Sequence, residues 1–577
     1  MGTELASSAP DVSALLRERA ERSRREAALL ARRIERVALS RLAVALLAVI
    51  AAAGAFGEPR HRAVFATALV LAAAGFVTLV VRNRRLTELR ITALGRATVS
   101  EQGAFRAERQ WARIDPQPWS WPSDDAEHQR VDLDVAGPES LIQLLPSISA
   151  AVGASRIREW FTSLADEATI RARQASIREL KDHVELREAF ELAARRLFMP
   201  EGRVAAFIEW GRAAIPPKPA SRRERARDAA LAAEAGARIA DAYAELIGLV
   251  CDARFETPLL RELQEKLGRE PAARADVALQ RIGRVAAWAE VRSSPMMHAT
   301  LQLLVAWDYQ IVRAVERWRA RFGPSLGAWF SALAEFECIA ALAGLAYANS
   351  SWVFPELAPE SPTKLRAQRL GHPLLPNDVR VLNDVEIGPP GSVLLISGSN
   401  MSGKSTLLRA IGLNALLARV GGPVCAEAMW CPPLRLCTSL RVQDSLAEGI
   451  SYFMAEALRL RDIVFAAEER TDDGTPAVLY LVDEILRGTN SEERAVASRF
   501  IVARLLKTTA IGAITTHDLG VFDVPEIAEH ARHAHFAEQF TGEGEARRLT
   551  FDYRLRPGPT TSSNALQLLS LIGLAEP

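Results

Sequence analysis

The chain has 577 residues, too many for one compact core, so two or more domains are expected. Its 71 basic and 70 acidic residues leave a formal net charge of only +1, which gives no global argument for a nucleic-acid partner. The five cysteines are too few and too irregular for a disulfide framework, and without a CxxC pair they argue against a zinc site. A reducing, cytosolic compartment fits the bulk of the chain.

Residues 1–38 form a basic leader in which apolar residues are mixed with many Arg and Glu. A helix is expected there, and its composition allows two interpretations. The helix could lie along a membrane surface. It could equally be a solvated cytoplasmic helix with ion pairs between neighbouring turns.

Residues 39–85 are predicted to form a transmembrane hairpin. Its two apolar stretches, Leu42–Gly57 and Ala63–Val81, contain no Asp, Glu, Lys or Arg. A membrane-spanning helix needs roughly 20 mostly apolar residues. The second stretch meets that length and the first reaches it when Val37–Arg41 is included, so the two helices are expected at about 39–57 and 63–81. The alternative interpretation is a buried helical hairpin in a soluble protein.

Basic residues flank the hairpin on both sides and predict its orientation. By the positive-inside rule, both termini and everything after the hairpin lie in the cytoplasm, with the hairpin in the inner (cytoplasmic) membrane. A signal peptide is not expected, because the first apolar stretch begins near residue 42, behind a charged leader. The flanking residues are Arg32, Arg33, Arg36 and Arg41 before the hairpin and Arg82, Arg84, Arg85 and Arg90 after it.

Residues 86–139 are expected to be a linker, because Asp115–Asp125 is rich in Pro and Trp. Over residues 140–355 apolar residues recur at spacings of three and four, which predicts an all-α domain. The sequence of this helical region shows no metal-binding cluster and no nucleophile with a neighbouring base.

The last third of the chain carries a phosphate-binding pattern. The apolar run Val393–Ile396 predicts a buried strand, and Leu407–Val420 predicts a helix. Between them stands GxxxxGK[ST], in the strand–loop–helix context that a P-loop requires. The predicted nucleotide-binding residues are Gly398, Ser399, Asn400, Met401, Ser402, Gly403, Lys404, Ser405 and Thr406.

The residue types in this loop suit the binding of ATP and Mg²⁺. Gly398 and Gly403 allow a tight backbone whose N–H groups turn toward phosphate oxygens, and the following helix N-terminus attracts anions. Lys404 would reach the β- and γ-phosphates, and the Ser405 hydroxyl would ligate Mg²⁺.

Two further predicted strands end in residues suited to hydrolysis. Ala477–Val482 is followed by Asp483, a predicted Mg²⁺ ligand, and by Glu484, which would polarise the attacking water. Ala510–Ile514 runs toward His517, which could contact the γ-phosphate because such sheets bind ligands at the carboxyl ends of their strands. Glu484 and His517 are therefore the predicted catalytic residues.

Taken together, these motifs resemble the ATPase domain of the MutS family. The loop SGSNMSGKST is similar to the MutS phosphate loop with its Asn-Met pair, and DEILRGTN at 483–490 is similar to the family's Walker B segment. DSLAEGISYFMAE at 444–456 is similar to the family's signature segment, and TTH at 515–517 to its histidine switch. The resemblance covers about residue 370 to the C-terminus, and more weakly residues 140–180, which are similar to the start of the MutS helical core.

The resemblance implies an ABC-like P-loop α/β ATPase domain at 356–577, with Mg²⁺-dependent ATP hydrolysis, behind a MutS core-like helical domain at 140–355. It implies that Ser451 reaches the γ-phosphate of the other subunit's ATP and that Gly449 permits this close approach, so a homodimer shares the site. Arg487 and Gly488 would lie on the loop that faces the partner, and Ser562–Leu574 would be the closing helix.

The chain departs from the mismatch-reading members of that family. Those members begin with a DNA-reading domain that carries a Phe-x-Glu wedge, and here the apolar hairpin takes its place. Phe207-Ile208-Glu209 has the right letters but lies in a helical stretch. Val381 stands where the family often has an aromatic residue against adenine. A membrane-tethered branch without the mismatch-recognition domain is the better match.

Three functions are compatible with these patterns. The first is a DNA-handling ATPase related to mismatch repair, which binds mismatched or structured DNA. The second is a membrane-bound ATPase switch that acts on a protein partner without DNA. The third is a transporter of ABC type, which two short spans per chain make the weakest. A basic concave surface between the helical arms would favour the first, and an apolar or acidic surface the second.

Overall fold

The computed structural model divides the chain into two compact units. The first comprises Met1–Ile114 with Glu188–Ala193, and the second comprises Asp115–Arg187 with Ala194–Pro577. The structure describes residues 11–57, 61–121, 127–148, 151–197, 201–213, 239–240, 242–268, 274–289, 291, 294–357, 363–399, 401–441, 452–469, 477–486, 491–517, 519–541 and 548–559.

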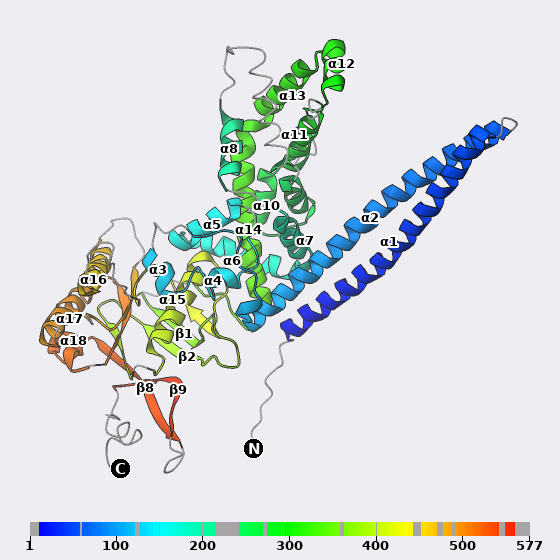
Figure 1. The fold of residues 1–577 in the computed structure, drawn as a ribbon. Helices are drawn as coiled ribbons and strands as arrows, with labels where there is room; N and C mark the ends of the chain where they lie inside the picture. The colour runs from blue at the N-terminus through cyan, green and yellow to red at the C-terminus, as the bar shows by residue number, and fades with distance from the viewer. Residues whose placement is uncertain are drawn as a thin grey trace. The chain divides into compact units, whose positions relative to one another are not determined.

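Two long helices, α1 (Val12–Gly57) and α2 (Arg62–Glu108), form the first unit and lie side by side in antiparallel orientation (Figure 1). The leader and the first apolar stretch are one continuous helix. Helix α2 continues beyond Arg85 to Glu108, so much of the segment expected to be a linker is helical. It is held there by packing, because small side chains such as Ala93 and Ala97 are buried. A short 3-10 turn, η2 (Trp111–Arg113), follows.

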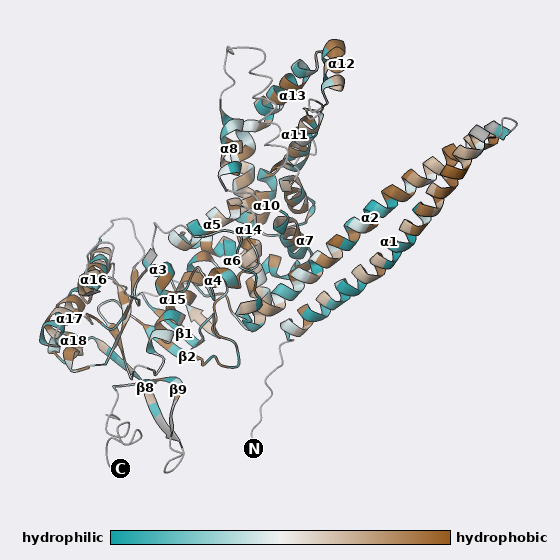
Figure 2. Cartoon of the chain, in the orientation of Figure 1, coloured by the Kyte–Doolittle hydropathy of each residue, from teal (hydrophilic) through white to brown (hydrophobic). Residues whose placement is uncertain are grey.

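Among the described residues, three helical segments are long and apolar enough to cross a membrane, and the extent of their burial distinguishes them. The third, Trp307–Ala348, has 72% of its apolar window buried inside the fold. The corresponding windows of the two hairpin helices are 11% and 0% buried. Figure 2 shows hydrophobic residues along the half of the hairpin nearest its turn. The apolar character of the third segment is therefore explained by core packing, whereas that of the hairpin is not.

The helical part of the second unit is organised around α14 (Leu326–Ala348), which is apolar on nearly all sides and buried along most of its length. Helices α5, α6, α8 and α10 all contact it. The other helices are α3 (Glu127–Asp132), α4 (Leu141–Leu144), α5 (Ala151–Thr162), α6 (Glu167–Asp182), α7 (Val184–Arg195), α8 (Glu201–Arg212), α10 (Pro258–Lys266), α11 (Ala275–Ala289), α12 (Pro295–Val305) and α13 (Trp307–Phe322), with a helical segment over 242–252 and the 3-10 turn η4 (Gly323–Ser325).

The α/β part contains a six-stranded sheet in the order β5-β6-β7-β3-β8-β9. All neighbouring pairs are parallel except β8 and β9, so the carboxyl ends of β3, β6 and β7 meet at one edge. A smaller antiparallel sheet has the order β2-β1-β4. The strands are β1 (Leu365–Leu370), β2 (Asn383–Ile387), β3 (Val393–Ser397), β4 (Ala428–Trp430), β5 (Arg435–Ser439), β6 (Val478–Asp483), β7 (Ile511–Thr516), β8 (Ala531–Thr541) and β9 (Arg548–Pro557).

Helices cover both faces of the parallel strands, as expected for strands that are apolar throughout. On one face, α15 (Lys404–Val420) brings Gly412 against the side chain of Leu481. On the other face, α16 (Tyr452–Glu468) and α17 (Ser491–Leu505) bury Tyr480 and Val482 in a shared core. The short helices η5 (Leu519–Phe522) and α18 (Pro525–Ala528) follow β7. The strand β6, buried on both faces, is therefore fixed in position where its last residue enters the site.

Candidate nucleotide site

The loop between β3 and α15 has the tight backbone conformation that its glycines predicted. Gly398 has φ 146° and Gly403 has φ 99°, both in the region that favours glycine. A Cβ atom on Gly398 would lie 2.7 Å from the Ser402 hydroxyl oxygen, so the loop has no room for a side chain there. The Ser402 backbone N–H and hydroxyl both donate to the Ser399 carbonyl, at 3.2 and 2.8 Å, and close the loop on itself.

Lys404, the first residue of α15, is buried to 4% exposure at the base of this loop. Its ammonium group donates to the carbonyl oxygens of Gly398 and Ser399, at 2.6 and 2.7 Å. These bonds hold the cation beside the loop where the pattern predicted a phosphate-binding lysine. The Ser399 hydroxyl oxygen is buried and has no hydrogen-bond partner among the described residues, so one polar atom of the cradle remains available to a ligand oxygen.

Two predicted Mg²⁺ ligands are brought together across neighbouring elements. The Ser405 hydroxyl, in the first turn of α15, donates to one Asp483 carboxylate oxygen at 2.6 Å. The Thr515 hydroxyl, on β7, donates to the other at 2.6 Å. A hydroxyl and a carboxylate are hard oxygen ligands of the kind that Mg²⁺ accepts together with phosphate oxygens and waters. The residues present therefore fit an ATP-bound Mg²⁺ ion.

Glu484 and His517, the predicted catalytic pair, are in contact. The His517 Nε2 atom and a Glu484 carboxylate oxygen form an ion-pair contact, with side chains 37% and 21% exposed. The Glu484 backbone has φ 58°, and its N–H donates to the carbonyl and the hydroxyl of Thr515, at 3.2 and 3.1 Å. These bonds fix an uncommon left-handed conformation, which turns Glu484 out of the line of β6 directly after the metal-ligand position.

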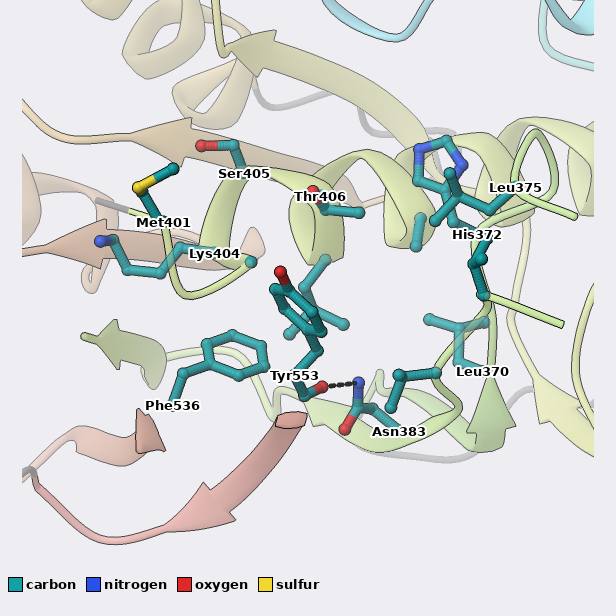
Figure 3. Close-up of a pocket in the computed structure, with 15 residues that line it drawn as sticks. Leu370, His372, Leu375, Asn383, Met401, Lys404, Ser405, Thr406, Phe536 and Tyr553 are labelled. Carbon is teal, nitrogen blue, oxygen red and sulfur yellow. Dashed lines mark hydrogen bonds between the residues drawn. The ribbon is translucent and has the colours of Figure 1, made fainter. Parts of the chain in front are cut away.

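A cavity of about 480 Å³ opens beside the loop (Figure 3). Lys404, Ser405 and Thr406 line one part of it, and β1 and the residues after it line another. Tyr553, on β9, projects into the space between them. Its backbone is held by Asn383, whose side chain donates to the Tyr553 carbonyl at 3.0 Å and accepts from the Leu555 N–H at 2.8 Å. The cavity is thus continuous from a phosphate-binding loop to a more apolar, aromatic part.

His372 lies buried at the apolar side of this cavity. Burial, together with the nearby Arg409 and Arg380 guanidinium groups, lowers the pKa of its imidazole to about 3. Its Nδ1 accepts from the Leu374 N–H at 3.2 Å, so the neutral ring carries its proton on Nε2. His372 is therefore a neutral hydrogen-bond donor in this region near neutral pH.

Sequence reasoning missed His372 and Tyr553, and for this side of the site it predicted the segment Val381–Asp384, which contains Asn383. Val381 does line the cavity. An aromatic ring on this side of the site comes instead from Tyr553, more than 170 residues later. No local sequence pattern predicts that Tyr553 lies near Val381. Asn400, Gly449, Ser451, Arg487, Gly488 and Ser562–Leu574 lie outside the described residues.

A second missed group links the site to α3. The Asp132 carboxylate is fully buried and accepts from the Thr438 hydroxyl at 2.8 Å and from the backbone N–H groups of Leu440 and Arg441, at 3.0 and 2.9 Å. Arg459, on α16, pairs with it at 3.2 Å. Asp132 thus fixes the end of β5 on one side of the signature segment and the first turns of α16 on the other.

Glu456 makes a comparable link on the other side of α16. Its side chain is 2% exposed, and a carboxylate oxygen accepts from the Leu486 N–H at 2.6 Å. Glu456 closes the signature segment and Leu486 follows the catalytic strand β6, so the two motifs are joined by a buried charge-assisted hydrogen bond.

The parallel sheet, the glycine-bearing loop, the buried lysine and the strand-end acids together define an ATPase-type α/β domain. The family comparison is more specific, since residues 394–577 match the model of MutS domain V. This part of the chain therefore belongs to the MutS family.

Proposed function

We propose that this chain is a membrane-tethered, ATP-hydrolysing MutS protein that works as a homodimer and acts on DNA. The observation that carries the ATPase proposal is the convergence of Lys404, Asp483 and Glu484 on one sheet edge, beside a cavity large enough for a nucleotide. Bound Mg²⁺ would neutralise phosphate charge and orient the nucleotide. Family membership supports the DNA-related role.

The residues of the site have separate roles in ATP hydrolysis. Lys404 and the loop N–H groups hold the phosphates, and Ser405 and Asp483 hold the metal ion. Glu484 accepts a proton from the attacking water, and its contact with His517 orients the carboxylate. Ser451, supplied by the second subunit, contacts the γ-phosphate and makes turnover depend on the dimer.

The hairpin of α1 and α2 anchors the protein in the cytoplasmic membrane, with both termini on the cytoplasmic side. Support comes from its outward-facing apolar side chains, of which Leu42 and Leu71 are 70% and 67% exposed. A soluble protein rarely leaves so long an apolar surface uncovered. The interpretation as a buried soluble hairpin predicts the opposite, because its apolar side chains would be covered by the rest of the chain.

A second candidate function is a membrane-bound switch that acts on a protein partner. The helix α12 favours it, since Pro295–Val305 contains no Asp, Glu, Lys or Arg, is largely hydrophobic (Figure 2) and has no buried residue. Met296 and Leu303 are 83% and 89% exposed. A surface that binds DNA is expected to be basic, whereas exposed Met and Leu are typical of protein-binding surfaces.

The ATPase rate of the detergent-solubilised full chain separates these candidates. It should be measured alone and with duplex, mismatched and branched DNA, at two salt concentrations. The DNA proposal expects stimulation by at least one DNA form and a weaker effect at higher salt, because phosphate contacts release counterions. An ATPase rate that no DNA form changes would contradict DNA handling and favour the protein-partner switch.

A further inference from the structure

Along the hairpin of α1 and α2, the exposed side chains change from mainly charged to mainly apolar at one level. Contacts between the two helices show which residues stand at that level. Leu30 on α1 packs with Ala93 and Leu86 on α2. Farther toward the turn, the Arg41 guanidinium lies 5.5 Å from the centre of the Phe76 ring. Residues 32–36 of α1 therefore stand beside the first residues of α2 that follow its apolar stretch.

Below this level, toward the start of α1, arginines are paired with carboxylates. Arg24 bonds Glu101 on α2 at 2.6 Å. Arg22 bonds Glu18 at 2.9 Å and Arg25 bonds Glu21 at 3.1 Å, each one turn away on α1. These three arginines are thus paired within the protein.

At the level itself, six exposed arginines pair with no carboxylate among the described residues. Only two carboxylates, Glu35 and Glu88, lie within residues 31–41 and 82–90, and Glu88 is paired with Arg84 at 3.3 Å. We call the unpaired set the arginine collar, which consists of Arg32, Arg33, Arg36, Arg82, Arg85 and Arg90.

The continuous apolar stretches of the hairpin begin directly above the collar. On α1, Leu39 and Leu42 are 68% and 70% exposed, and on α2 Val81 is 48% exposed. A row of unpaired guanidinium groups bordered by exposed aliphatic side chains matches the boundary between phospholipid phosphates and acyl chains. Toward the base of the hairpin, Arg22, Arg24 and Arg25 are instead paired with carboxylates.

We propose that the arginine collar binds the phosphate groups of anionic phospholipids where the hairpin enters the membrane. The proposal rests on the proposed membrane anchoring and adds the lipid class that the anchor selects. Guanidinium groups form paired, charge-assisted hydrogen bonds with phosphate oxygens, and a net negative headgroup adds attraction that a zwitterionic one lacks. The charge of the collar therefore gives the anchor a preference for anionic over zwitterionic lipid.

DNA also presents phosphates, but the surroundings of the collar favour lipid. A duplex laid across the collar would cover exposed Leu39 and Leu42 without any apolar partner for them. A phospholipid satisfies the guanidinium groups and the neighbouring leucines at once.

The test uses the full chain in a neutral detergent, incubated with equal amounts of phosphatidylglycerol and phosphatidylcholine that carry the same acyl chains. The protein is separated by size exclusion, and the lipid that co-elutes is counted by mass spectrometry. The wild-type chain should retain phosphatidylglycerol several-fold over phosphatidylcholine at low salt, with a smaller ratio at high salt. The triple variant Arg32→Gln, Arg33→Gln, Arg36→Gln should bring the ratio close to one.

The matched control replaces three paired arginines of the same helix, Arg22→Gln, Arg24→Gln and Arg25→Gln. It should keep the wild-type lipid ratio, and both triple variants should keep the wild-type ATPase rate. An equal retention of the two lipids by the wild-type chain, or an equal loss of preference in both triple variants, would overturn the collar.

Two further readouts separate the remaining outcomes. Loss of binding to a labelled DNA duplex in the collar variant, with the lipid ratio unchanged, would assign the collar to DNA and overturn the proposal. A chain that stays in solution without detergent and retains neither lipid would overturn the membrane anchor itself and the collar with it.

Discussion

Lys404 illustrates how the site depends on single side chains. Its ammonium group is buried and bonded to two loop carbonyls, so it is already positioned beside the backbone that would receive phosphate. Because the loop orients it, a ligand does not have to order a flexible side chain on binding, which lowers the entropy cost of binding. The same reasoning applies to Asp483, which two hydroxyl donors hold in place.

The substitution Lys404→Ala should weaken ATP binding strongly. Loss of one charged hydrogen-bonding group costs about 1.5–3 kcal/mol, or roughly ten- to a hundredfold in Kd. Binding of a fluorescent ATP analogue to the detergent-solubilised chain measures this. Lys507→Ala, an exposed lysine of the same domain, is the control and should bind as the wild-type chain does. Equal affinities in the two variants would contradict the assigned role of Lys404.

His372 predicts a pH dependence of stability. Its pKa is about 3 in the folded chain against an ordinary value of 6.5, mainly because burial disfavours the charged ring. The unfolded chain therefore takes up a proton as pH falls below about 6.5 while the folded chain does not, so stability is lost over the window from about 6.5 toward 3.

The wild-type chain should accordingly lose about 1 kcal/mol from this group between pH 7.5 and pH 5.5. His372→Gln should lose less over the same interval, because glutamine does not titrate. Thermal unfolding of both proteins at the two pH values measures the difference. Equal pH slopes would show that His372 does not titrate as its burial implies.

Among the elements, the six-residue helix α3 links β5 to α16. Its last residue, Asp132, is fully buried between β5 and α16 and bonds to groups on both. Arg441 is the last described residue before the signature segment at 444–456. The end of β5 that leads toward this segment is thus held by a residue about 300 positions earlier in the chain.

Asp132→Asn should destabilise the α/β part considerably. Breaking a buried ion pair by neutralising one partner costs about 3–5 kcal/mol, because Arg459 keeps its charge in a buried place. Asp134→Asn is the matched control two residues away, since the Asp134 side chain is 29% exposed in its pair with Arg441 and should cost about 1 kcal/mol or less. Thermal unfolding of the two variants should separate them, and similar unfolding temperatures would refute this role of Asp132.

Elements with strong local patterns could be predicted from the sequence. The strands β3, β6 and β7 and the helix α15 lie within one to three residues of the expected bounds, because apolar runs bordered by Gly, Asp or His carry their own signal. The helix α2 extends 23 residues past the expected end of the hairpin at Arg85, since its packing partner is α1 and not a neighbour in sequence. Asp132 and Tyr553 could not be found for the same reason, because their partners are distant in the chain.

At the scale of the whole molecule, the chain combines an ATPase-type domain with a hairpin whose apolar residues face outward. Helix α14 shows that apolar composition alone does not indicate a membrane, since its side chains are buried by α5, α6, α8 and α10. The distinction lies in what covers each helix. The apolar windows of the hairpin helices are only 11% and 0% buried, and their outer faces are left for another apolar medium.

The full chain should therefore stay in the membrane pellet after an alkaline carbonate wash. Replacing Leu46 and Leu71, which are 61% and 67% exposed, with lysine should release much of it, because a lysine in the apolar layer costs about 2.5–3.5 kcal/mol. Leu15→Lys with Leu29→Lys, two exposed leucines outside the apolar half, should have no such effect. Release of the wild-type chain by carbonate would contradict membrane insertion.

We propose that Mg²⁺-dependent ATP hydrolysis occurs at the shared edge of β3, β6 and β7, with Glu484 as the base. The most direct measurement compares ATP turnover and ATP binding in the wild-type chain and in Glu484→Gln, with Glu468→Gln as an exposed control on α16. Glu484→Gln should bind ATP with nearly wild-type affinity but hydrolyse it about a hundredfold or more slowly. Glu468→Gln should keep the wild-type affinity and turnover rate. Wild-type turnover by the Glu484→Gln protein would contradict the claim.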